Sequence, residues 1–199
     1  QSGIDYITIS TLGNSQDFGD MSSARRGLGG SGSSVRGIFT GGDAGPGHPS
    51  NVMGHVTIPS LGNETDFGNL TVGRESTAAL SDSVRSISIA GYAAPANSDV
   101  MDFITITALG NAIDFGDLST ARSNVATFGS TTRGVMAGGE QPSSANLIDF
   151  ITIQTAGNST SFGNLGVSAY NSGPTGSSNS TRGLILGGNS PSPIGRLNT

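Results

Sequence analysis

Residues 101–139 read MDFITITALGNAIDFGDLSTARSNVATFGSTTRGVMAGG, and this stretch decides the fold. It holds a β-branched and aromatic run, a Gly-Asn pair, a Phe-Gly pair, an Arg, a second Arg and a Gly-Gly pair. Most of these features return in the same order elsewhere in the 199 residues. The Gly-Asn pairs begin at Gly13, Gly62, Gly110 and Gly157, which are 49, 48 and 47 residues apart. The chain therefore consists of four tandem copies of a unit of about 48 residues.

Three further positions keep the same phase. The Phe of the Phe-Gly pair is Phe18, Phe67, Phe115 and Phe162. The first Arg is Arg25, Arg74 and Arg122, with Ala169 in the fourth copy. The second Arg is Arg36, Arg85 and Arg133, and its fourth copy, Arg182, comes two residues late. A residue that every copy carries serves what every copy needs, so we expect the four Phe residues to be buried between sheets and the second Arg to pack between neighbouring units. The alternative for the second Arg is a ring of guanidinium groups around the axis that binds an anion.

Each unit reads as four short strands, here called a to d. The c strand is richest in β-branched residues, as in Met101–Ile106, and the b strand is typified by Arg133–Ala137. No stretch shows a sustained 3.6-residue apolar period, so few helices are expected. Four strands in a unit of this length predict an all-β fold, a four-bladed β-propeller forming one domain over residues 1–199. Its blades would be residues 21–68, 69–116, 117–164, and 165–199 together with 1–20.

These residues resemble a degenerate kelch repeat. The strand Val135–Gly139 ends in the Gly-Gly pair of that repeat, and Tyr6, Phe103 and Phe150 resemble its Tyr. The in-phase Phe of each unit stands where kelch repeats usually have Trp. The phrase IDYITI, followed by GN and DFGD, also resembles repeats of marine bacteriophage structural and tail-fibre proteins. The resemblance implies a kelch-like propeller whose last blade combines strands from both ends of the chain.

Closure of the ring is expected within one chain. The chain begins with c and d strands and ends with a and b strands, and Leu197-Asn198-Thr199 would lead into Ile4. A sheet shared by both ends hides edges that could otherwise pair with other chains, so a monomer is expected. Two alternatives stay open, namely two chains in one eight-bladed ring and a trimeric β-fibre.

Composition removes several classes of function. The net charge is −5 and all nine basic residues are Arg, so the basic surface that binds nucleic acid is not expected. The chain has no Cys, which excludes disulfides, thiol catalysis and the Cys-containing copper site of kelch-type oxidases. No apolar run is long enough for a membrane span. We expect no cofactor.

Catalytic and metal sites are also not expected. The only histidines are His48 and His55, and a metal would need further ligands such as Asp43. We interpret both as surface residues. Many Ser residues are present, but no nucleophile-elbow motif accompanies them.

A ligand is expected on the face formed by the b-to-c loops, which are residues 43–51, 92–98, 140–145 and 189–196. These loops differ between copies, and binding residues concentrate on loops held by a rigid scaffold. The candidates there are Asp43, His48, Tyr92 and Glu140, together with Arg25, Arg74 and Arg122 in the adjoining d-to-a connections.

The function expected from these observations is a non-enzymatic binding or structural module. It would act outside a cell or on a virion, attaching to a surface glycan or protein. The alternatives are a hydrolase or lyase on the propeller face, and a consensus-like propeller without a ligand. A deep pocket with converging titratable groups would favour the enzyme, and a shallow face would favour the module.

Overall fold

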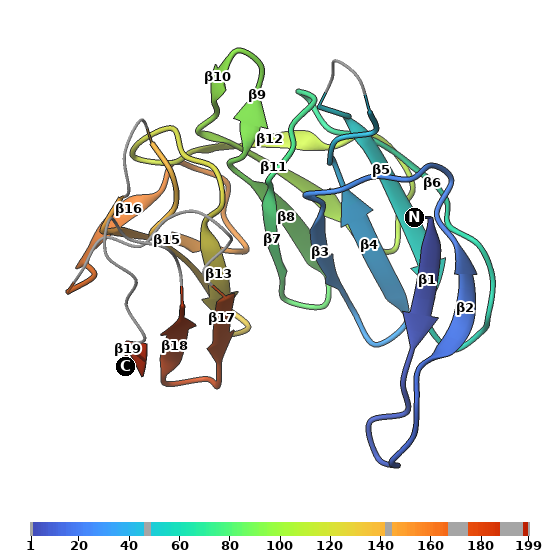
Figure 1. Cartoon of the computed structure of the whole chain (residues 1–199). Helices are drawn as coiled ribbons and strands as arrows, with labels where there is room; N and C mark the ends of the chain where they lie inside the picture. Colours follow the sequence, from blue (N-terminus) through green and yellow to red (C-terminus); the bar gives the residue numbers. More distant parts are fainter. Residues whose placement is uncertain (1, 46–48, 142–144, 167–174, 188–196, 199) are drawn as a thin grey trace.

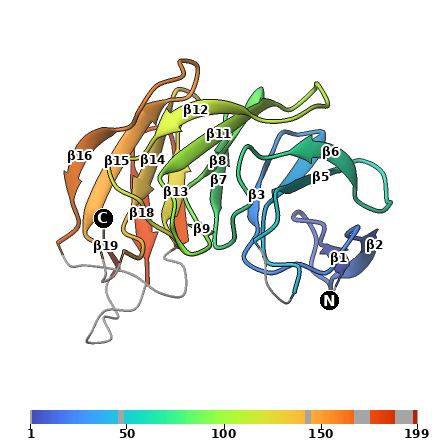
Figure 2. The same cartoon turned by 90° about the horizontal axis from the view of Figure 1, so that it is seen from above.

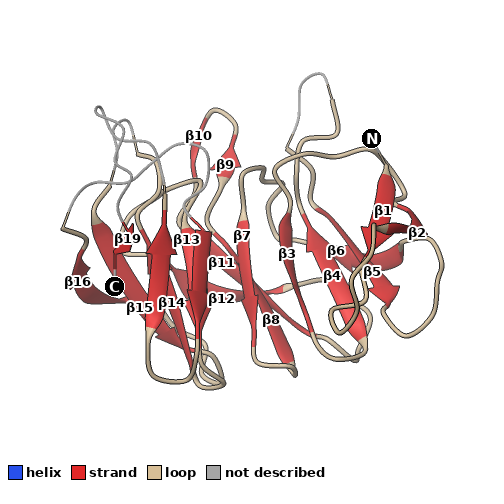
Figure 3. Ribbon diagram, turned by 60° about the horizontal axis from the view of Figure 1, so that its bottom comes forward, coloured by secondary structure: helices blue, strands red, loops and turns tan. Residues whose placement is uncertain are grey.

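The computed structural model describes residues 2–45, 49–141, 145–166, 175–187 and 197–198. Within them the only regular secondary structure is the β-strand, arranged in small antiparallel sheets (Figure 1 and Figure 3). The expected all-β class is therefore confirmed. The sheets stand side by side in a row that follows the sequence, with the N-terminus at one end and the C-terminus at the other (Figures 1 and 2).

Three sheets have four strands each, in the order of the chain. The β3–β6 sheet contains β3 (Gly29–Gly32), β4 (Arg36–Thr40), β5 (Val52–Thr57) and β6 (Thr65–Asn69). The β7–β12 sheet contains β7 (Ala78–Ser81), β8 (Arg85–Ile89), β11 (Val100–Thr105) and β12 (Ile113–Asp117). The β13–β16 sheet contains β13 (Ala126–Gly129), β14 (Arg133–Ala137), β15 (Leu147–Thr152) and β16 (Thr160–Asn164). The strands match the expected a, b, c and d segments of the sequence unit.

The three sheets also share one irregularity. The pairing of the c and d strands shifts register at the same place in each, between Met53 and Gly54, Met101 and Asp102, and Ile148 and Asp149. The N-terminal hairpin of β1 (Gly3–Tyr6) and β2 (Gln16–Asp20) shifts between Ile4 and Asp5. A β-bulge of this kind bends a strand and increases its twist, so all four c strands bend alike.

The two ends of the chain form separate, incomplete sheets. The N-terminal hairpin is a two-stranded sheet, and β17 (Thr175–Ser178), β18 (Gly183–Leu186) and β19 (Leu197–Asn198) form the C-terminal sheet. Among the described strands the expected last blade made from both ends is not found, and their row of sheets is open. One physical reason is local, because Leu197 pairs with Leu186 and so takes the place that Ile4 would need.

Apolar side chains pack between neighbouring sheets rather than inside one sheet. Ile104 of β11 and Ile106, just after this strand, join a buried cluster with Ile38, Met53 and Phe67 of the preceding sheet. Ile151 and Ile153 do the same against the β7–β12 sheet. The core is therefore divided among the junctions between sheets, and each sheet depends on its neighbour for burial.

A Gly-Asn turn closes each of these junctions. Gly157 donates its N–H to the carbonyl of Phe115 at 2.6 Å, and Asn158 Oδ1 accepts the N–H of Asp117 at 3.0 Å. Gly116 has a φ of +134°, and a Cβ there would collide with the backbone of Gly157. The Phe-Gly and Gly-Asn pairs of the sequence are thus the two sides of one contact between sheets.

The in-phase Phe residues differ in burial. Phe18, Phe67 and Phe115 are buried, as the core interpretation requires. Phe162 is 56 % exposed, so its expected burial is wrong in this structure. The reason is that Phe162 lies at the end of the row, where no further c and d strands cover it.

Candidate functional site

A shallow groove of about 640 Å³ lies on the b-to-c loop face, between the β7–β12 and β13–β16 sheets. The short hairpin of β9 (Tyr92–Ala93) and β10 (Ala96–Asn97) forms one wall. Two of the predicted ligand residues, Tyr92 and Glu140, line it together. The polar side chains that line the groove are those of Glu75, Ser76, Tyr92, Asn97, Ser123, Asn124, Glu140 and Gln141.

Backbone pairing fixes the positions of Tyr92 and Glu140. Tyr92 exchanges two backbone hydrogen bonds with Glu75, of 2.7 and 3.0 Å. Glu140 does the same with Ser123, at 2.8 and 3.0 Å. Both pairs join the end of a b strand to the connection that precedes the a strand of the same sheet. The loop face therefore presents these side chains from paired backbone.

Two amide side chains tie the groove walls together. Asn97 Nδ2 donates to the carbonyl of Glu140 at 2.7 Å, and Asn124 Nδ2 donates to its carboxylate at 3.3 Å. Ser76 and Asn124 both adopt positive φ, of 51° and 53°. Asn tolerates this left-handed conformation better than most residues. The groove is therefore a polar surface with one aromatic ring, and most of its polar side chains, including Tyr92, are half-buried.

The other loop candidates are not in this groove. Asp43 lies on the corresponding loop of the β3–β6 sheet and pairs with the largely exposed Arg26 at 2.7 Å. The N–H of Gly45 and the guanidinium of Arg26 lower the pKa of Asp43. His48 lies outside the described residues.

The three connection arginines lie inside the fold and not on the exposed loop face where the sequence-based interpretation expected them. The side chains of Arg25, Arg74 and Arg122 are fully buried. Arg122 donates to the carbonyls of Gly138 and Leu147, at 3.0 and 3.2 Å, and pairs with Asp149. Each guanidinium thus fastens a d-to-a connection onto the sheet that follows it.

Each buried arginine has a carboxylate partner. Arg74 pairs with Asp102 at 2.7 Å, and Arg25 pairs with Glu64. Burial lowers the pKa of Arg74 and of Arg122, and the neighbouring Asp in each pair opposes that shift. A hydroxyl of the same connection also donates to each carboxylate, from Ser22, Thr71 and Ser119.

Glu64 is a functional residue that the sequence analysis missed. Asp102 and Asp149 stand at one position of the c strand, but the β3–β6 sheet has Gly54 there. A Cβ built on Gly54 would fall within the carboxylate group of Glu64. The connection that leads into β6 therefore supplies the missing acid. The signal was the pairing of an unusual Gly in the c strand with an unusual Glu after the Gly-Asn turn.

The second set of arginines lies between sheets. Arg36 donates to the carbonyl of Ile106 at 2.7 Å, and Arg85 donates to that of Ile153 at 3.2 Å. Arg85 and Arg133 also lie over the rings of Phe103 and Phe150. This is the arrangement that the packing interpretation describes. Arg133 and Arg182 are exposed at the open end of the row.

His55 is not a surface residue, which corrects a further prediction. It is 8 % exposed and meets the ring of Phe67 edge-to-face, with ring centres 5.6 Å apart. Burial and the charge of Arg36 lower its pKa. His55 occupies the place of Phe103 and Phe150, whose rings meet Phe115 and Phe162 in the same way.

Among the described residues, no three His, Asp or Glu side chains gather as a metal site would require. No helix in the described ranges could cross a membrane. No protein-family model matches the chain, and no curated protein sequence matches it.

Proposed function

We propose that the protein is a non-enzymatic binding module that holds a glycan in the groove around Tyr92. The observation that carries this proposal is one half-buried aromatic ring among carboxylate and amide groups on a fixed loop face. Tyr offers a large amphipathic contact surface at little cost in side-chain entropy. The apolar face of a sugar ring can lie on such a surface.

The polar groups around Tyr92 match the hydroxyl groups of a sugar. Sugar hydroxyls both donate and accept hydrogen bonds, and Glu75, Glu140 and Asn97 offer both kinds of group around Tyr92. The surface carries no Lys, and the Arg side chains nearest the groove are buried in ion pairs. A neutral glycan therefore suits the groove better than a phosphorylated or sulfated one.

The setting that we propose is outside a cell or on a virion, with a surface glycan as the target. The composition and the resemblance to phage structural repeats support this setting. A hydrolase is the second candidate, because two carboxylates, Glu75 and Glu140, line one groove. A pair of carboxylates is the usual equipment of glycoside hydrolysis.

A screen of the intact protein against an array of neutral and charged oligosaccharides tests the proposal. We expect binding of neutral sugars, and a loss of at least about tenfold in affinity for Tyr92→Ala. Tyr92→Phe keeps the aromatic face and should bind within a few-fold of the parent. Leu109→Ala, at an exposed c-to-d turn on the opposite end of the strands, is the control.

Two results would count against the module. Binding that survives Tyr92→Ala unchanged would place the ligand elsewhere. Release of shortened sugars from a bound oligosaccharide, abolished by Glu140→Gln, would identify a hydrolase instead. Unfolding curves of each variant separate a lost contact from a lost fold.

A further inference from the structure

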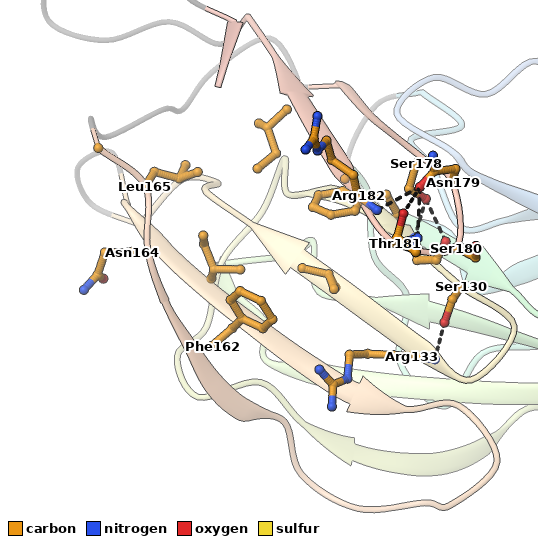
Figure 4. Close-up of a pocket in the computed structure, with 17 residues that line it drawn as sticks. Ser130, Arg133, Phe162, Asn164, Leu165, Ser178, Asn179, Ser180, Thr181 and Arg182 are labelled. Carbon is orange, nitrogen blue, oxygen red and sulfur yellow. Dashed lines mark hydrogen bonds between the residues drawn. The ribbon is translucent and has the colours of Figure 1, made fainter. Parts of the chain in front are cut away.

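A cavity of about 710 Å³ lies at the open end of the row (Figure 4). The β13–β16 sheet forms one wall and the β17–β18 hairpin forms the other. Its apolar lining includes Phe128, Val135, Ile148, Phe162 and Ile185. At the other junctions, the c and d strands of the next sheet occupy this place and cover the Phe that corresponds to Phe162.

A complete junction shows what is missing. At the junction between the β7–β12 and β13–β16 sheets, Gly157 donates to Phe115, Asn158 accepts from Asp117, and Ser159 donates to Asp117. The same three bonds recur at Gly62, Asn63 and Glu64, and at Gly110, Asn111 and Ala112. None of the described residues makes them at the open end. Gly163, the counterpart of Gly116, has nothing within 4 Å of its Cβ position.

The N-terminal hairpin carries the matching half of such a junction. Its turn, Gly13-Asn14-Ser15, holds the places of Gly157, Asn158 and Ser159 in the sequence unit. Ile7 and Ile9 are 64 % and 96 % exposed, whereas their counterparts Ile151 and Ile153 are 3 % and 1 % exposed. The hairpin therefore exposes to solvent two residues whose counterparts are buried at both junctions between four-stranded sheets.

The strand edges agree with this match. In the β13–β16 sheet the b and c strands pair over five positions, from Arg133 with Thr152 to Ala137 with Ile148. In the C-terminal sheet β19 pairs with β18 over two positions only, at Ile185 and Leu186. In the first sheet β1 pairs with β2 alone. The edge of β18 thus lacks most of the c-strand partner that the β13–β16 sheet has. The free edge of the N-terminal hairpin is the edge of a c strand, β1.

We propose that the N-terminal hairpin of a second copy of this chain docks at the open end, next to β18 and against the β13–β16 sheet. The hairpin and the open end lie at opposite ends of the row, so one copy reaches the next head to tail (Figures 1 and 2). Such a contact gives a closed ring of copies if the rotation closes and a filament if it does not. Pairing of a free sheet edge with an added strand is a common mode of association.

Docking gives each missing contact a named partner. Gly13 donates to the carbonyl of Phe162, Asn14 accepts the N–H of Asn164, and Ser15 donates to the carbonyl of Asn164. Arg133 donates to the carbonyl of Ile9, as Arg85 donates to that of Ile153. Strand β1 pairs with β18 from Leu186 with Ile4 to Gly183 with Ile7, and it displaces β19.

Two features of the chain limit the strength of this contact. Asp5 would enter the place of Asp149, but the arginine position of the fourth unit is Ala169, which lies outside the described residues. A carboxylate without its guanidinium is costly to bury. Strand β19 also competes for the edge of β18, and it carries Asn198 at the position of Asp5. We expect Asp5→Asn to lower the concentration of half-association by about tenfold.

Cross-linking tests the proposal directly, because the chain has no Cys of its own. Two single variants, Ser15→Cys and Asn164→Cys, are mixed and oxidised. We expect a cross-linked product of twice the chain mass. Thr107→Cys, at the turn of a junction that is already complete, replaces Ser15→Cys in the control mixture and should give no product.

The variant with both substitutions in one chain distinguishes a second copy from closure within one chain. A cross-linked product of single-chain mass, with no larger species, would overturn the proposal in favour of closure. A monomeric mass at every concentration, with no cross-link in the mixture, would overturn it altogether.

Light scattering on the unmodified chain gives the second readout. We expect the mass to rise with protein concentration to twice the chain mass or more. The variant Ile7→Asp/Ile9→Asp should stay monomeric without losing stability, since both side chains are exposed in one copy. Leu109→Asp, an equally exposed residue, should associate like the parent. Association that survives Ile7→Asp/Ile9→Asp would contradict the proposal.

Discussion

The closed junction around Phe115 and the open end around Phe162 are built from the same residues. Each Phe meets a Phe of the adjacent strand edge-to-face, with ring centres 6.0 and 6.1 Å apart. Yet Phe115 is 2 % exposed and Phe162 is 56 % exposed. The strands of one sheet therefore fix the ring pair, and the Gly-Asn turn of the next sheet buries it. In this fold, a Phe at this position is therefore buried only where a neighbouring sheet covers it.

The largest expected effect separates Arg122 from Arg133. Arg122→Ala leaves Asp149 buried without a partner and removes two bonds to carbonyls, so it should cost about 3–5 kcal/mol of unfolding free energy. Arg133→Ala should cost less than about 1 kcal/mol in a single copy, because that side chain is exposed and only stacks on Phe150. Chemical denaturation at low protein concentration measures both. Equal losses would show that the open end is closed in solution.

The two Phe positions give the next comparison. Phe115→Ala should cost about 3–5 kcal/mol, because the ring fills the space between two sheets. Phe162→Ala should cost under about 1 kcal/mol in the monomer, since half of its surface is already in water. The same denaturation curves decide this. A loss under about 1 kcal/mol for Phe115→Ala would remove that ring from the core.

A smaller effect tests the exchange between Gly54 and Glu64. Glu64→Ala should destabilise the β3–β6 sheet, because Arg25 loses its carboxylate. Gly54→Asp alone should also destabilise, because its side chain would meet Glu64. The double variant restores the arrangement of Asp102 with Ala112, so it should come within about 1 kcal/mol of the parent. A double-mutant cycle measures this coupling, and simple addition of the two losses would contradict the exchange.

Part of this architecture follows from the sequence. The four strands of each unit were predictable from β-branched runs and turn pairs, and the burial of Phe67 and Phe115 followed from their phase. Tyr92 and Glu140 were predictable as neighbours on the loop face because both follow a b strand.

Other features were out of reach of a single sequence. The position of a residue within the repeated unit shows that Arg74 and Arg85 both recur. It does not show that Arg74 is buried beside an acid while Arg85 lies between sheets. Glu64 was not predicted because this acid lies in the turn before the d strand, whereas Asp102 lies in the c strand. Closure of the ring depends on the angle between sheets, which local patterns do not encode.

The smallest expected effect concerns His55, which replaces the ring that Phe103 and Phe150 provide in the other complete sheets. Burial lowers its pKa, so the folded state prefers the neutral imidazole. The unfolded chain binds the proton more readily near the ordinary pKa of about 6.5. Stability from this site is therefore full above that pH and is lost as the pH falls through the lowered pKa.

His55→Phe should remove this dependence, because the ring pair with Phe67 keeps its edge-to-face geometry without a titrating group. Unfolding free energies of the parent and the variant, measured between pH 7.5 and pH 5, test it. We expect the parent to lose more stability than the variant as the pH falls. All other residues are the same in both proteins, so their contributions cancel in the difference. Parallel curves would show that His55 is as accessible to protons in the folded sheet as in the unfolded chain.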